Sequence, residues 1–210
     1  MIKKKHDIIE FGFTRFHDIS GIEKAEYKPL YNLKGIHKID EVRNDIFSKG
    51  VWFSWTRVYK KSLFDKIRFP EGVFYEDLMT IPFIYLKDLI AFFVDRSLIG
   101  YRYNPDSITA LHTGSHAMDL YEFYLSLRNV EITAAVNVLK IRVARSIVYF
   151  SNELGLTNIP IVEIIDDINQ MPKDVCILKA LKHPDLFFFM MPNMYNIFDS
   201  FRLKKKTRRI

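Results

Sequence analysis

Alternating apolar positions predict a strand at the start of the chain. Within residues 7–17, Ile9, Phe11 and Phe13 place apolar side chains at every second position, which is the period of a strand. Residues 18–38 carry glycine, proline and asparagine among charged side chains. They predict a loop or a short hairpin.

Helix signals follow this loop. Asp40 can cap a helix that Gly50 would end, and a short helix is expected at residues 63–67. After a proline–glycine turn, residues 76–87 predict another helix. Pro82 should kink or break it, because proline has no N–H group to donate.

Strand signals end in the middle of the chain. Residues 90–95 and 97–104 predict two strands, whereas residues 117–154 contain neither proline nor glycine and predict helix. Further helices are expected at residues 160–170 and 174–182.

This pattern predicts two regions of different character. We expect an α/β domain over residues 1–115, followed by an α-helical extension with a basic tail over residues 116–210.

Composition indicates a folded protein in a reducing compartment. Of the 210 residues, 49% are hydrophobic and 15% aromatic, enough to bury a core. The single Cys176 cannot form an internal disulfide. The amino end lacks the apolar core of a signal peptide, and no stretch reaches the roughly 18 apolar residues of a membrane span. These features favour a cytoplasmic location.

The net charge of +6 is concentrated at the carboxyl end. Residues 201–210 contain six basic residues and no acidic one, which equals the whole excess. The rest of the chain is therefore close to neutral, and we expect no nucleic-acid partner.

Three short motifs occur in order between residues 55 and 109. The first is WTRVYK at residues 55–60, and the second is FPEG at 69–72 followed by YEDL at 75–78. The third is YRY at 101–103, followed by SIT at 107–109. Each motif alone is weakly informative, and the order and spacing of the three carry the information.

These motifs resemble those of inverting family-two glycosyltransferases with the GT-A fold, especially bacterial enzymes of surface-polysaccharide synthesis. The resemblance covers about residues 7–110 and departs from the family at Thr56, where asparagine is usual. It implies a partial GT-A-type mixed sheet with flanking helices. The family's nucleotide-binding strand and its Asp-x-Asp metal motif are not found, so we expect the acceptor-handling part of such an enzyme, without the nucleotide-binding half.

The resemblance also implies the chemistry. Asp77 would be the general base that removes the proton of the acceptor hydroxyl, and Glu76 would orient it. The competing interpretation is that both carboxylates only cap the helix that begins there. A divalent ion, Mn²⁺ or Mg²⁺, is expected in the intact enzyme. No metal ligands are assigned in this chain, because the only adjacent aspartates, Asp166 and Asp167, lie in an expected helix.

Three side chains are candidates for binding the acceptor. Trp55 could stack on a sugar ring or pack in the core. Lys60, like Arg57, could contact phosphate or the acceptor, and Arg102 could pair with Asp77 or Glu76 or touch the diphosphate. A solvated role is the alternative for Lys60, as it is for Arg57. His112 and His116 have the spacing of metal ligands on a helix, but Gly114 and Ser115 between them argue against that helix, and no metal is assigned there.

The carboxyl end predicts contact with a membrane. Residues 186–198 are apolar and aromatic, and the basic tail follows them. This combination is typical of a peripheral anchor on the anionic inner face of a membrane, and it would suit a lipid-linked acceptor. The alternative is a packed final helix with a solvated tail.

We therefore expect transfer of a sugar from a nucleotide-sugar donor to a surface-polysaccharide or lipid-linked glycan acceptor. Two alternatives remain open. The chain could be a catalytically inactive glycosyltransferase remnant, or a membrane-associated module with no enzymatic role.

Overall fold

The computed structural model describes residues 6–17, 31–105, 107 and 113–207, with side chains as far as residue 203. The chain forms two compact units. Unit 1 contains residues 1–71 and 76–111, and unit 2 contains residues 72–75 and 112–210. Unit 1 is built around a sheet and unit 2 from helices, so the expected α/β class is confirmed.

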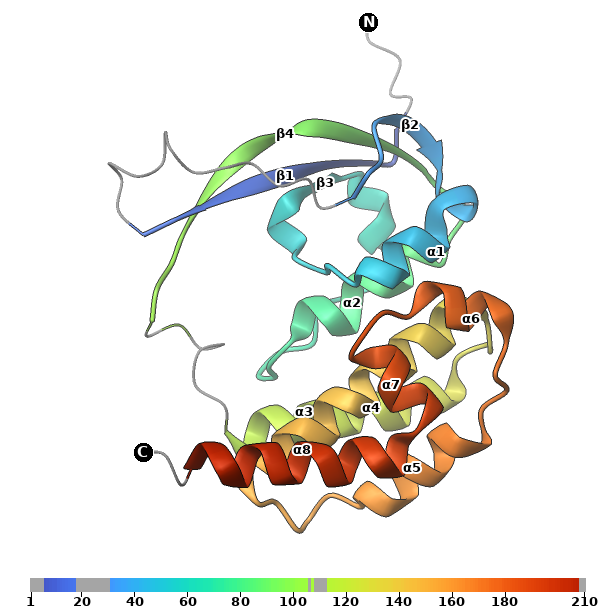
Figure 1. Ribbon diagram of the computed structural model, residues 1–210. Helices are drawn as coiled ribbons and strands as arrows, with labels where there is room; N and C mark the ends of the chain where they lie inside the picture. The colour runs from blue at the N-terminus through green and yellow to red at the C-terminus, as the bar shows by residue number, and fades with distance from the viewer. Residues whose placement is uncertain (1–5, 18–30, 106, 108–112, 208–210) are drawn as a thin grey trace, which may run out of the picture. The chain divides into compact units, whose positions relative to one another are not determined.

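The sheet of unit 1 mixes parallel and antiparallel strands. In the described residues its strand order is β2-β4-β1-β3 (Figure 1). The bounds are β1 Ile8–Phe16, β2 Gly35–Lys38, β3 Arg57–Tyr59 and β4 Ile90–Arg102. Strand β1 runs parallel to β4, while β3 pairs antiparallel with β1 and β2 antiparallel with β4. The strand predicted at residues 7–17 is confirmed as β1.

Strand β4 is continuous, so the prediction of two strands was wrong. Its pairing with β1 shifts where Phe11 faces Val94 but Gly12 faces Ser97. Asp95 and Arg96 between these pairs are left out of register and are exposed. A bulge admits such charged residues without ending the strand, because it turns them out of the ladder.

The buried face of β1 is the one that carries Ile8, Glu10 and Thr14, and not the more apolar face that carries Ile9, Phe11 and Phe13. Ile8, Glu10 and Thr14 are buried, whereas Phe11 and Phe13 are half-buried on the other face. The alternation therefore identified the strand but not its inward side. Glu10 can lie inside because a buried arginine pairs with it.

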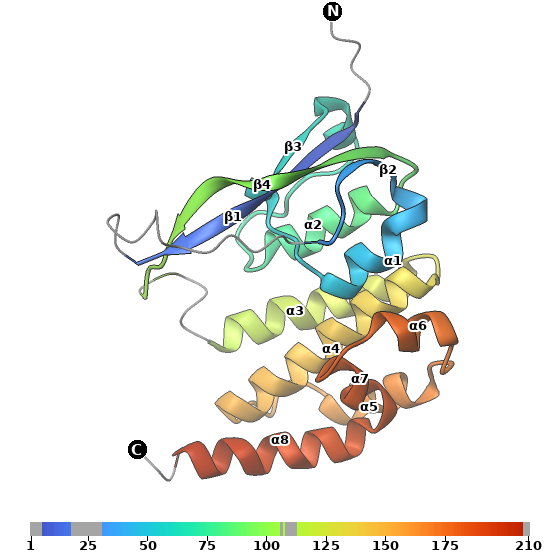
Figure 2. The same cartoon turned by 45° about the horizontal axis from the view of Figure 1, so that its top comes forward.

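Helices α1 (Ile39–Lys49) and α2 (Glu76–Tyr85) lie on the same side of the sheet (Figures 1 and 2). Helix α1 begins one residue before Asp40, which lies in its first turn and does not cap it. Gly50 ends α1 in the left-handed conformation with a φ of 61°, as predicted. Helix α2 runs through Pro82 without a break. The described residues of unit 1 also form the short 3₁₀ helices η2 (Ser54–Thr56) and η3 (Lys61–Phe64).

Unit 2 is assembled around one long helix, α4. The helices are α3 Gly114–Ser126, α4 Ala134–Leu154, α5 Ile161–Gln170, α6 Val175–Ala180, α7 Asp185–Met190 and α8 Pro192–Thr207. Helix α4 contacts each of the others. The helices predicted at residues 160–170 and 174–182 are confirmed. The stretch 117–154 is divided, because Thr133 starts a new helix by accepting a hydrogen bond from the Val136 N–H.

Residues 72–75 belong to unit 2 although unit 1 surrounds them in sequence. The Phe74 N–H donates to Asp119 Oδ2 at 2.8 Å, and the Phe74 ring stacks on His116 with centroids 3.7 Å apart. Among the described helices, none has the length and apolar character needed to cross a bilayer.

Candidate functional site

A buried ion pair lies beneath the first sequence motif. Arg57 donates to Glu10 Oε1 at 2.9 Å, and their side chains are 0% and 2% exposed. Tyr85 donates to the other Glu10 oxygen at 2.5 Å and accepts from Arg57 Nε at 2.8 Å. Burial alone would lower the pKa of Arg57, but the Glu10 carboxylate together with the hydroxyls of Tyr85, Tyr31 and Tyr59 raises that pKa well above its ordinary value. The guanidinium therefore stays charged although it is buried. Because the side chain is 0% exposed, the alternative of a solvated Arg57 was wrong.

The same guanidinium holds the loop that carries Trp55. Arg57 donates to the carbonyl oxygens of Val51 at 2.6 Å and Phe53 at 2.5 Å. The Thr56 hydroxyl donates to the Phe53 carbonyl at 2.9 Å, so threonine closes the turn where asparagine is usual in the resembled family. Residues 51–56 are thus fixed from the inside of unit 1.

Trp55 lies at the centre of a stack of aromatic rings. Its ring is parallel to Tyr101 on one side, with centroids 5.0 Å apart, and to Phe53 on the other, at 5.2 Å. Phe13 meets it edge-on at 4.9 Å. The four side chains are half-buried or exposed, with Phe53 37% exposed. The stack therefore presents aromatic surface to solvent, and it joins the first sequence motif to the third.

Asp77 joins the second motif to the first. Its carboxylate accepts a hydrogen bond from the Ser54 N–H at 3.2 Å, and Ser54 directly precedes Trp55. In the described part of the chain this carboxylate makes no bond to the amides of its own helix, and Oδ1 has no protein partner. Asp77 is half-buried and Glu76 is exposed. Capping of α2 therefore does not account for Asp77.

The backbone is strained directly before these carboxylates. Tyr75 has a φ of 62°, a conformation that costs a side-chain-bearing residue of order 1 kcal/mol or more. Strain of this kind concentrates at functional sites, because neighbouring packing must hold it in place.

A buried hydroxyl near Asp77 lacks a partner. Within the described residues, the Tyr59 hydroxyl is shielded from solvent and makes no hydrogen bond. Burial raises the pKa of Tyr59 above its ordinary value; the nearby Arg57 offsets only part of this rise, and the carboxylates of Glu10 and Asp77 add to it. The hydroxyl therefore remains protonated, as an available donor. Sequence reasoning missed it, although Tyr59 lies inside the first motif.

The other two predicted acceptor-binding residues occupy different surroundings. Lys60 pairs with Asp7 at 2.7 Å, and Asp7 also accepts from the Ile90 N–H at 2.9 Å. The contacts of Lys60 and Asp7 therefore connect the end of β3 with the beginnings of β1 and β4. Arg102 is exposed at the end of β4, and in the described residues it makes no ion pair with Glu76 or Asp77. Its role stays a prediction, as does acceptor binding by Lys60.

The residues considered as metal ligands do not form a cluster where the structure describes them. His112 lies outside the described residues. His116 is buried, and its Nδ1 accepts from the Thr113 N–H at 3.2 Å at the start of α3. Asp167 is bound by Arg128 at 2.8 Å. No three His, Cys, Asp or Glu side chains converge in the described part of the chain. We therefore assign no residue here to the expected Mn²⁺ or Mg²⁺.

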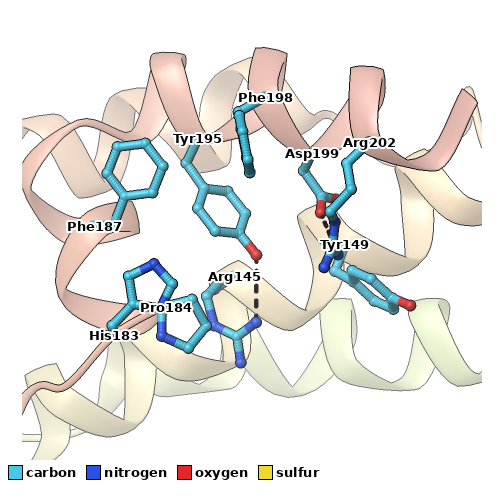
Figure 3. A pocket seen from close by; sticks show the side chains of 9 residues that line it. All are labelled: Arg145, Tyr149, His183, Pro184, Phe187, Tyr195, Phe198, Asp199 and Arg202. Carbon is cyan, nitrogen blue, oxygen red and sulfur yellow. Dashed lines mark hydrogen bonds and ion pairs between the residues drawn. The ribbon is translucent and has the colours of Figure 1, made fainter. Parts of the chain in front are cut away.

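Unit 2 contains a separate pocket of about 270 Å³ between α4 and α8 (Figure 3). Aromatic side chains and two arginines line it together with one carboxylate. The lining residues are Arg145, Tyr149, His183, Pro184, Phe187, Tyr195, Phe198, Asp199 and Arg202. Both arginines are partly committed, because Arg145 bonds Asp185 at 2.5 Å and Arg202 bonds Asp199 at 2.8 Å.

Comparison with models of known protein families gives no match, and comparison with curated proteins gives no significant similarity. The resemblance to family-two glycosyltransferases therefore rests on the three motifs. The structure adds that one residue of each motif takes part in contacts within unit 1: Tyr101 stacks on Trp55, and Asp77 binds the N–H of Ser54, the neighbour of Trp55.

Proposed function

We propose that the chain supplies the acceptor-side carboxylate of an inverting sugar transfer on a GT-A-type domain. The donor is a nucleotide sugar, and the acceptor is a hydroxyl of a surface-polysaccharide or lipid-linked glycan. The single observation that carries the proposal is the hydrogen bond from the Ser54 N–H to Asp77 Oδ2, beside the exposed stack around Trp55.

The bond to Ser54 gives Asp77 the geometry of a general base. One carboxylate oxygen is held and the other is unbonded, so the free oxygen can accept a proton from a hydroxyl within hydrogen-bond reach. As the acceptor oxygen bonds to the anomeric carbon, its proton moves to Asp77. The bond from that carbon to the diphosphate breaks, and the diphosphate leaves with the bonding electrons.

The aromatic stack suits a sugar acceptor. The apolar face of a sugar ring packs against aromatic side chains. Trp55 is covered by Tyr101 and Phe53, so the surface offered to a sugar is that of the outer ring Phe53, which is 37% exposed, and of the ring edges of the stack. The buried network of Arg57 fixes the backbone of this loop, so the rings and the carboxylate keep their spacing. Positioning of this kind is a large part of how enzymes lower a barrier.

Asp77 acts on the acceptor, and the donor would need separate groups. Mn²⁺ or Mg²⁺ would neutralise the departing diphosphate. No ligand set for that ion is assigned among the described residues, and the proton transfer to Asp77 does not depend on such an assignment.

The test is Asp77→Asn, which keeps the shape of the side chain and removes the base. We expect sugar transfer, measured with a panel of radiolabelled nucleotide sugars and the native membrane fraction as acceptor, to fall about 10²–10⁴-fold. Asp45→Asn, at an exposed carboxylate of α1, is the matched control and should retain activity.

Retained turnover in Asp77→Asn with an unchanged fold would refute the assignment of the base. If the unaltered protein neither transfers a sugar nor binds a nucleotide sugar in the presence of Mn²⁺, the interpretation as an inactive remnant replaces the proposal.

A further inference from the structure

Helix α8 turns its apolar side outward. Six large apolar side chains at the end of α7 and along α8 are between 46% and 69% exposed. They are Met190, Met191, Met194, Ile197, Phe198 and Phe201. Their spacing follows the helical repeat, so within α8 they form one stripe on a single face.

The inner face of α8 is held by polar contacts. Tyr195 and Asp199 are buried at 5% and 2% exposure. Arg145 of α4 donates to the Tyr195 hydroxyl at 3.4 Å, and Asn152 of α4 donates to the Asn196 side chain at 2.9 Å. Figure 3 shows Tyr195 and Asp199 directed from α8 toward α4. The polarity of α8 is therefore reversed relative to an ordinary surface helix, which buries its apolar side.

This reversal is difficult to explain by packing within unit 2. Single exposed apolar residues are common on protein surfaces, but a continuous stripe marks an interaction surface. Three exposed apolar residues elsewhere in unit 2, Ile132, Val162 and Val175, lie on different elements. The stripe on α8 thus differs from scattered exposure by its continuity.

The charge around the stripe indicates its partner. Arg202 follows the last apolar residue and is exposed, and the sequence continues with Lys204, Lys205, Lys206, Arg208 and Arg209 without an acidic residue. Beside the stripe, Arg145 and Arg202 are partly exposed, whereas the carboxylates that they bind, those of Asp185 and Asp199, are buried. An apolar face followed by a dense positive charge is complementary to an anionic phospholipid surface.

We infer that the outer face of α8 docks on an anionic lipid bilayer. The stripe would enter the boundary between head groups and acyl chains, while the basic residues remain among the phosphates. Phe198 belongs to the stripe and also lines the pocket of Figure 3, as does Arg202, so the pocket lies beside the docking surface. This inference concerns unit 2 only and does not depend on sugar transfer by unit 1.

The experiment is flotation of the full chain with two kinds of vesicle, phosphatidylcholine alone and phosphatidylcholine mixed with phosphatidylglycerol. We expect binding to the anionic vesicles that weakens as salt is raised. The triple substitution Met194→Ser, Ile197→Ser and Phe201→Ser removes three apolar residues of the stripe and leaves Phe198, which also lines the pocket. The substitution should weaken binding at least about tenfold.

Two further variants make the result specific. Ile132→Ser, Val162→Ser and Val175→Ser together remove as many exposed apolar residues from other parts of unit 2, and this triple variant should bind like the unaltered protein. Lys204→Gln, Lys205→Gln and Lys206→Gln together should reduce binding to anionic vesicles and flatten its salt dependence.

Each contrary outcome overturns the inference. Equal binding to neutral and anionic vesicles would remove the role of charge. Unchanged binding of the α8 triple variant would remove the role of the stripe. A dimer that forms without lipid and is lost in the same triple variant, measured by analytical ultracentrifugation, would assign the stripe to a second copy of the chain.

Discussion

Each unit of this protein contains an arginine–carboxylate cluster, and the two clusters differ in how closed they are. In unit 1 one guanidinium meets one carboxylate, and both are completely enclosed. In unit 2 Arg142 and Arg145 share Asp185, which is 7% exposed, while the arginines are 24% and 23% exposed. The first cluster is closed to solvent, and the second contains two partly exposed arginines, one of which, Arg145, lines a pocket.

This difference indicates a structural role for Arg57, whereas Arg145 has donors near a pocket where a ligand could reach them. Arg57 uses its donors on Glu10, Tyr85 and backbone carbonyls, so it holds the loop of Trp55 and has little left for a ligand. Arg145 bonds Asp185 and Tyr195 but also lines an open pocket. We therefore expect that breaking the enclosed cluster around Arg57 costs more free energy of unfolding than breaking the cluster around Arg145. We expect a ligand to bind at the solvent-accessible cluster around Arg145.

The largest effect is expected from Arg57→Met. The substitution leaves Glu10 buried without its cation, and breaking such a pair costs about 3–5 kcal/mol. Tryptophan fluorescence during urea unfolding measures it, because both tryptophans, Trp52 and Trp55, belong to unit 1.

The double variant Glu10→Leu with Arg57→Met should recover part of the lost stability, since no buried charge then stays unpaired. An unfolding midpoint for Arg57→Met equal to that of the unaltered protein would show that the closed cluster is not structural.

A smaller effect is expected from Asp185→Asn. The two arginines lose their shared carboxylate but keep access to water, so the loss in unit 2 should be about 1.5–3 kcal/mol. Far-UV circular dichroism follows it, because unit 2 contains most of the helix. Asp166→Asn, at an exposed carboxylate of α5, serves as the control. A loss as large as that of Arg57→Met would contradict the link between closure and cost.

The smallest effect is expected at Lys60–Asp7, which is the most exposed of the ion pairs compared, with side chains 37% and 23% exposed. Lys60→Gln should cost only about 0.2–1 kcal/mol at neutral pH. Burial would raise the pKa of Asp7, but the Ile90 N–H and Lys60 outweigh it and leave that pKa below its ordinary value of 3.8. The stabilisation is therefore present above pH 3.8 and is lost as the pH falls through the lowered value.

Urea unfolding of the unaltered protein and of Lys60→Gln, measured as the pH is lowered, tests this direction. A difference in free energy of unfolding that grows below pH 3.8 would contradict it. In transfer assays, a raised KM in Lys60→Gln with unchanged stability would instead support the acceptor-binding role predicted for Lys60.

Local features could be predicted from the sequence where neighbouring residues determine them. The strand β1 and the stop of α1 at Gly50 are of this kind, because periodicity and a left-handed glycine act within a few residues. The bulge of β4 could not be predicted, since Asp95 and Arg96 have the composition of a turn and only pairing with β1 keeps the strand continuous.

The candidate site depended on contacts between distant residues. Glu10 and Arg57 are 47 residues apart, and Ser54 and Asp77 are 23 apart, so no local pattern joins them. The motifs identified Trp55 and Asp77 as candidates, but not the bond to Ser54 or the enclosure of Arg57. The resemblance identified candidate residues, but their distances and hydrogen bonds depend on tertiary packing that the sequence does not reveal.

The return of residues 72–75 to unit 2 makes the architecture interleaved. The chain crosses between the units after residues 71, 75 and 111. A single cut therefore cannot separate them cleanly: a fragment ending at residue 111 would strip Phe74 of Asp119 and His116, immediately before the carboxylates of α2. Moving either unit into another protein would require the contacts of residues 72–75 to be rebuilt. Exchange of these units between proteins by a single recombination event is therefore disfavoured.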